Sequence, residues 1–172
     1  MVKDKTGGLF RLAVRLMQAF ASSHKDTDFA PLVNNLALYF QIRDDFINLA
    51  DEEYMKSKSF CEDITEGKFS FPIVHCVRKD PSDTRLLNIL KQRTEDDDVK
   101  RYAQWMMRES GSLQYTREKC ASVKKELIQQ IQDLGGNEPL LKIIEFLDVQ
   151  LEGMLSDTGL TPRRPGTKHI DA

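Results

Sequence analysis

A helical apolar pattern and a cluster of polar oxygens meet in the stretch Gln41-Ile42-Arg43-Asp44-Asp45-Phe46-Ile47-Asn48. In an α-helix, residues that are three, four or seven positions apart lie on one face. That face would carry Gln41, Asp44, Asp45 and Asn48. Two adjacent carboxylates repel each other unless a cation, lysines or open water compensate them. The stretch therefore predicts a helix with a face of hard oxygen ligands, which are the kind that Mg²⁺ prefers.

Helical periodicity extends outward from this stretch in both directions, and we find neither strand-like alternation nor an internal repeat. The first predicted helix carries Leu9, Leu12, Ala13, Leu16, Met17 and Phe20. A second helix is expected to start near residue 28 and to carry the acidic face, followed by a polar loop at 52–69. Further helices are expected at 70–79, at Leu86, Leu87 and Leu90 with Ser82 or Asp83 as the cap, and at 96–109, 112–134 and 138–155. The pattern predicts an all-α protein with one domain at 1–155 and a disordered tail at 156–172.

Composition excludes several classes of function. The chain has 172 residues, 25 Lys and Arg, 27 Asp and Glu, and a net charge of −2, so nothing suggests a nucleic-acid partner or a polybasic membrane anchor. No apolar run approaches the roughly 18 residues of a transmembrane segment. Three cysteines are far apart and odd in number, which is typical of reduced thiols in a cytoplasmic protein; they are Cys61, Cys76 and Cys120.

Lysines near the acidic face could supply the second half of a diphosphate site. Lys5-Thr6 precedes the first predicted helix, while Lys58 and Lys68 flank the polar loop that follows the acidic helix. Lysine ammonium groups are compact point charges that suit diphosphate oxygens not bound by Mg²⁺. Two interpretations remain open on this basis alone. One is a Mg²⁺-diphosphate site, and the other is a solvated helix face beside ordinary surface lysines.

Three segments in order and spacing resemble the C-terminal half of a trans-prenyltransferase of the geranylgeranyl diphosphate synthase type. They are Lys5-Thr6-Gly7-Gly8-Leu9-Phe10, Phe40-Gln41-Ile42-Arg43-Asp44-Asp45, and the run from Lys58 to Pro72 (KSFCEDITEGKFSFP). The similarity covers about residues 1–150. It implies part of an isoprenoid-synthase helical bundle and the joining of isopentenyl diphosphate to an allylic diphosphate, from farnesyl to geranylgeranyl diphosphate.

The resemblance also implies roles for particular residues. Asp44 and Asp45 match the catalytic carboxylates of the second aspartate-rich motif, which hold Mg²⁺ against the allylic diphosphate. Asn48 stands where the common form of that motif has a third aspartate, and is the third expected metal ligand. Positions that contact the allylic diphosphate in such enzymes are matched by Lys5, Thr6, Gln41, Lys58 and Lys68.

One part of the family pattern is missing from this chain. Such synthases carry a first aspartate-rich motif, DDxxD, and an isopentenyl diphosphate site upstream of the segments quoted above. The acidic cluster Asp96-Asp97-Asp98 is no substitute, because it stands at a predicted helix start, where carboxylates cap the helix or meet solvent. We therefore expect a fragment, a truncated gene model or a short isoform that is inactive alone, with the apolar faces of its first two helices uncovered.

Three functions follow from these expectations. The chain is the catalytic C-terminal half of a synthase, a non-catalytic subunit that pairs with full-length synthase chains, or a helical module whose acidic face is only solvated. The family resemblance favours the first and implies a homo-oligomer or pairing with a full-length synthase.

Overall fold

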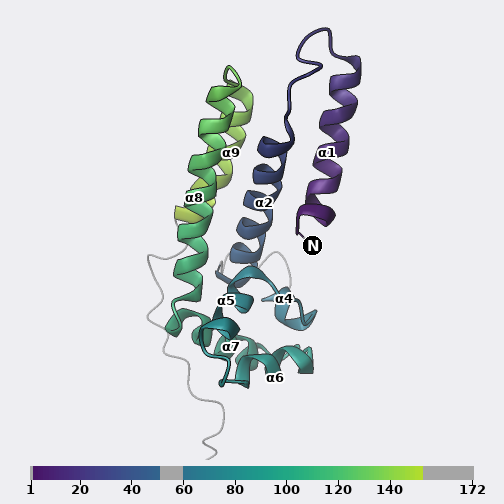
Figure 1. Ribbon diagram of the computed structural model, residues 1–172. Helices are drawn as coiled ribbons and strands as arrows, with labels where there is room; N and C mark the ends of the chain where they lie inside the picture. The colour runs from purple at the N-terminus through teal and green to yellow at the C-terminus, as the bar shows by residue number, and fades with distance from the viewer. Residues whose placement is uncertain (1, 51–59, 153–172) are drawn as a thin grey trace, which may run out of the picture. The chain divides into compact units, whose positions relative to one another are not determined.

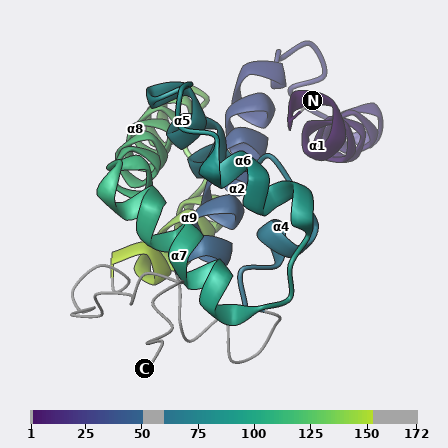
Figure 2. The same cartoon turned by 90° about the horizontal axis from the view of Figure 1, so that it is seen from below.

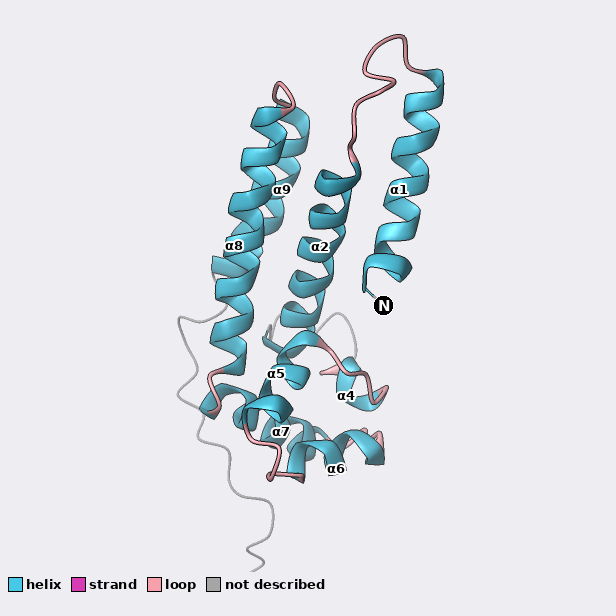
Figure 3. Ribbon diagram, viewed as in Figure 1, coloured by secondary structure: helices cyan, strands magenta, loops and turns pink. Residues whose placement is uncertain are grey.

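The computed structural model describes the backbone of residues 2–50 and 60–152, and within those ranges the side chains of residues 7–148. Every regular element in these ranges is a helix (Figure 3), which confirms the all-α prediction for the described part of the chain. The helices are α1 (Val2–Phe20), α2 (Ala30–Ala50), α4 (Glu62–Thr65), α5 (Phe71–Lys79), α6 (Arg85–Gln92), α7 (Asp97–Glu109), α8 (Ser112–Asp133) and α9 (Glu138–Glu152).

The chain forms two compact units, and the long helices α2 and α8 each contribute to both. The first unit comprises residues 1–44 and 118–151. In it α1 runs antiparallel to α2, and α8 forms an antiparallel pair with α9 (Figure 1). Arg11 donates a 2.7 Å hydrogen bond to Asn34, and Arg43 donates one of 2.9 Å to the carbonyl of Leu147. The core of this unit includes Val33, Ala37, Tyr39, Cys120, Val123, Leu127, Ile131 and Ile144.

The second unit contains residues 45–117, in which α4, α5 and α7 lie around the last turns of α2 (Figure 2). Helix α6 contacts α4, α5 and α7, and α5 also contacts α7. The buried amide of Gln104 donates a 2.8 Å hydrogen bond to the carbonyl of Leu49, which satisfies one of the free carbonyls at the end of α2. The core of this unit includes Phe46, Leu49, Ile64, Ile73, Leu86, Leu90, Met107 and Leu113.

Local sequence signals account for several helix ends. Ser70 precedes α5, which has proline in its first turn, and the Asp96 carboxylate accepts hydrogen bonds from the first turn of α7. Gly135 and Gly136 end α8 with φ angles of +98° and +82°, a conformation that favours glycine. The N-cap of α6 is Thr84, not residue 82 or 83 as predicted. The side chain of Asp83 nevertheless accepts a hydrogen bond from the backbone N–H of Arg85, the first residue of α6.

Two sequence expectations need correction. The predicted polar loop at 52–69 contains the short helix α4, because Asp63 and Ile64 are buried rather than solvated; its residues 52–59 lie outside the described part. In α7 the sequence pattern predicts Val99, Tyr102, Met106 and Trp105 to face inward, but of these only Met106 belongs to the fully buried face. That face carries Lys100, Ala103, Gln104, Met106 and Met107, while Val99, Tyr102 and Trp105 are only half-buried.

The apolar face of α1 is uncovered, as predicted. Leu9, Leu12, Leu16, Met17 and Phe20 are between 54% and 89% exposed. The same prediction for the second helix holds only in part, because Leu32, Leu36 and Phe40 are half-buried and Tyr39 is fully buried. The predicted tail at 156–172 lies outside the described residues, and the single domain at 1–155 stays a prediction.

Candidate diphosphate-binding site

Asp44 and Asp45 are neighbours in the chain but have opposite surroundings. Successive residues of a helix point about 100° apart, so one of the pair can face solvent while the other faces the protein. Asp44 is exposed, whereas Asp45 is 5% exposed. The two carboxylates of the acidic motif are therefore not equivalent.

The buried carboxylate of Asp45 joins α2 to the segment that follows it in the chain. Its Oδ1 atom lies 3.1 Å from the ammonium nitrogen of Lys68. Its Oδ2 atom accepts a 2.8 Å hydrogen bond from the backbone N–H of Phe71, the first residue of α5. A carboxylate at a helix N-terminus is also favoured by the helix dipole. Asp45 is consequently an anchor for this segment as well as a candidate metal ligand.

Lys68 is shared between two carboxylates. Its ammonium nitrogen lies 2.9 Å from Oδ1 of Asp63 in addition to its contact with Asp45. Burial lowers the pKa of Lys68, but the hydrogen bond to Asp63 and the charges of Asp45 and Asp63 outweigh this and raise the pKa above its ordinary value. The lysine therefore stays charged at neutral pH.

Asp63 is the residue of this cluster that sequence reasoning missed. It is 4% exposed, and burial raises its pKa to about 6 even though Lys68 acts in the opposite direction. Its backbone N–H donates a 3.0 Å hydrogen bond to the side-chain oxygen of Asn48. Asp63 could have been noticed because it is an acid five residues before Lys68 in the run from Lys58 to Pro72. The sequence does not show that Asp63 is buried, because burial depends on the tertiary fold.

A tight turn brings Lys68 back beside Asp63. The backbone N–H of Lys68 donates to the carbonyl of Asp63 at 2.8 Å, and that of Gly67 donates to Ile64 at 3.1 Å. Gly67 has a φ angle of +66°, which a residue with a side chain adopts only with strain. The glycine thus allows the turn that places the lysine.

The structure brings together three of the predicted site residues, namely Asp45, Asn48 and Lys68, around Asp63. Gln41 is half-buried one helical turn before Asp44 and Asp45. The side chains of Lys5 and Thr6, and the whole of Lys58, lie outside the described part, so their roles stay predictions.

The donor set fits an open Mg²⁺ site rather than a closed protein cage. Among the described residues, no three His, Cys, Asp or Glu side chains are grouped so as to hold a metal ion. Mg²⁺ in phosphate-transfer sites is often bound through one or two carboxylates, with waters and phosphate oxygens completing its shell. The exposed carboxylate of Asp44 meets that requirement, with Asp45 one residue further along the same helix.

Comparison with known proteins assigns the family. A family model described as polyprenyl synthetase matches residues 1–107, which is more than half of the chain. The chain belongs to the polyprenyl synthetase family. It is 54% identical over 148 residues to a geranylgeranyl pyrophosphate synthase of Dictyostelium discoideum, a match that covers 86% of this chain and 48% of the relative.

Two further relatives give the same picture. A geranylgeranyl pyrophosphate synthase of Mucor circinelloides f. lusitanicus is 51% identical over 150 residues, covering 87% of this chain and 49% of the relative. A terpene synthase of Matsumurasca onukii is 52% identical over 144 residues, covering 84% and 46%. The chain therefore spans about half the length of the curated relatives it matches within the polyprenyl synthetase family.

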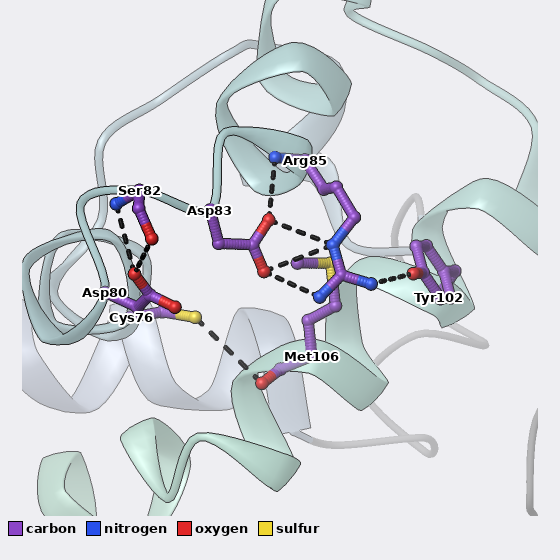
Figure 4. Close-up of polar contacts among 7 residues, drawn as sticks. All are labelled: Cys76, Asp80, Ser82, Asp83, Arg85, Tyr102 and Met106. Carbon is purple, nitrogen blue, oxygen red and sulfur yellow. Dashed lines mark hydrogen bonds and ion pairs between the residues drawn. The ribbon is translucent and has the colours of Figure 1, made fainter.

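A cleft in the second unit is lined by residues of α5, α6 and α7. It has a volume of about 460 Å³ and is lined partly by Lys79, Arg85 and Trp105. Its arginine is paired with Asp83 at 2.6 Å and donates to Tyr102 at 2.7 Å (Figure 4). Lys79 donates to the carbonyl of Ser110. Both cations are therefore engaged by protein groups, and Asp80 and Asp83 place carboxylates in the same cleft.

Within the described ranges, no helix is long and apolar enough to cross a membrane.

Proposed function

We propose that this chain carries the allylic-diphosphate half of a prenyl-chain-elongating synthase of the geranylgeranyl diphosphate type. The observation that supports the proposal most strongly is the charged Lys68 held beside Asp45, with the exposed carboxylate of Asp44 on the same helix. Cations and a metal-binding carboxylate are the groups that a diphosphate requires. The relatives printed as geranylgeranyl pyrophosphate synthases support the substrate class.

The proposed reaction joins isopentenyl diphosphate to an allylic diphosphate, from farnesyl to geranylgeranyl diphosphate. The allylic C–O bond breaks and its electron pair leaves with the pyrophosphate. The double bond of isopentenyl diphosphate then forms the new C–C bond, and loss of a proton completes a chain that is longer by five carbons. When bound, Mg²⁺ neutralises charge on the departing pyrophosphate.

The chain's own residues would bind and orient the allylic diphosphate. Lys68 supplies a fixed positive charge for the leaving group, and Asp44 and Asp45, with Asn48, are the proposed metal ligands. In the structure the oxygens of Asp45 and Asn48 accept from Phe71 and Asp63, so Asp44 is the carboxylate that is open to a metal. The remaining proposed diphosphate contacts are Lys5, Thr6, Gln41 and Lys58.

The isolated chain is expected to be inactive, because the first aspartate-rich motif of the family is not found in it. The test is to incubate the purified chain with farnesyl diphosphate, isopentenyl diphosphate and Mg²⁺, and to analyse the products by mass spectrometry. We expect no geranylgeranyl diphosphate. Its formation at a rate abolished by Asp44→Ala would contradict the expected inactivity while supporting the assigned chemistry.

A second candidate function is a non-catalytic subunit that binds full-length synthase chains of this family. The exposed apolar face of α1, formed by Leu9, Leu12, Leu16, Met17 and Phe20, favours it because apolar patches of this kind mark protein contacts. The partner that we propose is a full-length polyprenyl synthase chain. The part of each relative that matches this chain is only about half of that relative, 48% in one and 49% in the other.

Co-expression with a full-length synthase of the same family tests this pairing. We expect the two chains to co-purify, and expect Leu12→Glu together with Leu16→Glu to abolish the association. Control substitutions at exposed residues off this face, Glu118→Gln with Lys125→Gln, should leave it intact. Association that the α1 variant does not weaken, or no association at all, would exclude this function.

A further inference from the structure

Two buried carboxylates hold one lysine in the cluster described above. Lys68 lies 3.1 Å from Asp45 and 2.9 Å from Asp63, and both acids are less than a tenth exposed. These contacts thus give one ammonium group two buried carboxylate partners. The question is why Lys68 has two carboxylate partners rather than one.

The two acids differ in what else they are expected to do. Asp45 lies beside the exposed Asp44 in the motif proposed to bind Mg²⁺. If Asp45 binds a metal ion, its ion pair with Lys68 becomes weaker. Asp63 lies outside that motif, and its carboxylate is 2.9 Å from the ammonium nitrogen of Lys68. We propose that Asp63 is a positioning residue, which keeps the ammonium group of Lys68 in place while Asp45 is engaged with the metal-bound diphosphate.

Asp63 is itself fixed independently of Lys68. Its backbone N–H donates to Asn48 at 3.0 Å, and its carbonyl accepts from the backbone of Lys68 at 2.8 Å. Its neighbour Ile64 is fully buried. These contacts would survive the loss of the side-chain charge, so Asp63→Asn removes the hold on Lys68 while it retains the local fold.

This inference rests on the proposed function, but a separate measurement tests the positioning itself. Chemical denaturation of the chain and of the variants Asp63→Asn, Lys68→Met and the double variant gives a double-mutant cycle. Because Asp63 and Lys68 are in direct contact, we expect the two substitutions to be coupled by about fivefold or more in the folding equilibrium constant. Additive effects would overturn the inference.

The second measurement is the affinity for inorganic pyrophosphate, determined by titration calorimetry at a fixed concentration of Mg²⁺. Asp63→Asn is expected to weaken binding about tenfold, because the ammonium is no longer held toward the site. Asp63→Glu, which restores the charge, should recover part of the loss. The control is Glu66→Gln, which removes one negative charge from an exposed position in the same segment.

The outcomes separate this inference from the proposed function. If the unaltered chain binds pyrophosphate and Asp63→Asn binds it equally well, Asp63 has no positioning role and the proposed function stands. If Glu66→Gln weakens binding as much as Asp63→Asn does, the effect is one of overall charge and the inference is wrong. If the unaltered chain binds no pyrophosphate, the proposed function fails, and the double-mutant cycle alone decides whether Asp63 holds Lys68.

Discussion

The carboxylate of Asp45 accepts a 2.8 Å hydrogen bond from the backbone N–H of Phe71 and thereby joins α2 to the first turn of α5. Its neighbour Asp44 is exposed to solvent. The structure thus shows a division between the carboxylate of Asp45, which anchors α5, and that of Asp44, which is exposed to solvent. This division makes the two residues separable by mutation.

Asp45→Ala is expected to lower the free energy of unfolding by about 2–4 kcal/mol, because it removes a buried partner of both Lys68 and the α5 N-terminus. Asp44→Ala is expected to change it by less than about 0.5 kcal/mol. Urea denaturation followed by circular dichroism measures both. Equal effects of the two substitutions would show that the described difference in burial does not hold in solution.

Sequence reasoning placed Asp44 and Asp45 on one helix face but could not separate them, because burial depends on segments far along the chain. Lys68 is predicted through its motif as a diphosphate contact, a role that stays a prediction, and the structure places its ammonium nitrogen 3.1 Å from the carboxylate of Asp45. Asp63 was missed, since only the turn at Gly67 brings its carboxylate to the same lysine. The starts of α5 and α7 and the end of α8 could be predicted, because they depend on nearby residues alone. Proline stands in the first turn of α5, aspartate caps α7, and glycines follow α8.

The turn that places Lys68 depends on glycine at position 67. Gly67→Ala should destabilise the chain by about 1–3 kcal/mol, because its φ angle is +66° and a new Cβ would lie 3.0 Å from the carbonyl oxygen of Leu90. The matched substitution Gly8→Ala, in a helix with open space around it, should stabilise by about 0.5–1 kcal/mol. Thermal or urea unfolding checks both signs, and a neutral Gly67→Ala would contradict the strained turn.

His75 is expected to make stability depend on pH. Burial, together with the charge of Lys79, lowers the pKa of His75, whose Nδ1 lies 2.8 Å from the Ser112 hydroxyl. The unfolded chain then binds a proton more readily than the folded chain does, so this contribution is present above about pH 6.5 and is lost as the pH falls. Unfolding at pH 7.5 and pH 5 should show a smaller acid-induced loss of stability for His75→Gln than for the unaltered chain. An identical loss would exclude His75 as its source.

The three cysteines should differ in reactivity. Cys61 and Cys120 are fully buried, and burial raises the pKa of each thiol to about 12, so almost no thiolate forms at pH 8. Cys76 is partly exposed. Iodoacetamide at pH 8, followed by peptide mass spectrometry, should modify Cys76 first and the other two only after denaturant is added. Labelling of Cys61 or Cys120 at the rate of Cys76 would contradict the described cores.

The central claim is that the acidic face of α2 binds a diphosphate through Mg²⁺. Titration of the purified chain with inorganic pyrophosphate, with Mg²⁺ and with EDTA in its place, tests this most directly. We predict binding that requires Mg²⁺ and that weakens by about tenfold or more in Asp44→Ala, a variant expected to fold normally. Pyrophosphate binding that is the same without Mg²⁺, or that Asp44→Ala leaves unchanged, would contradict the account.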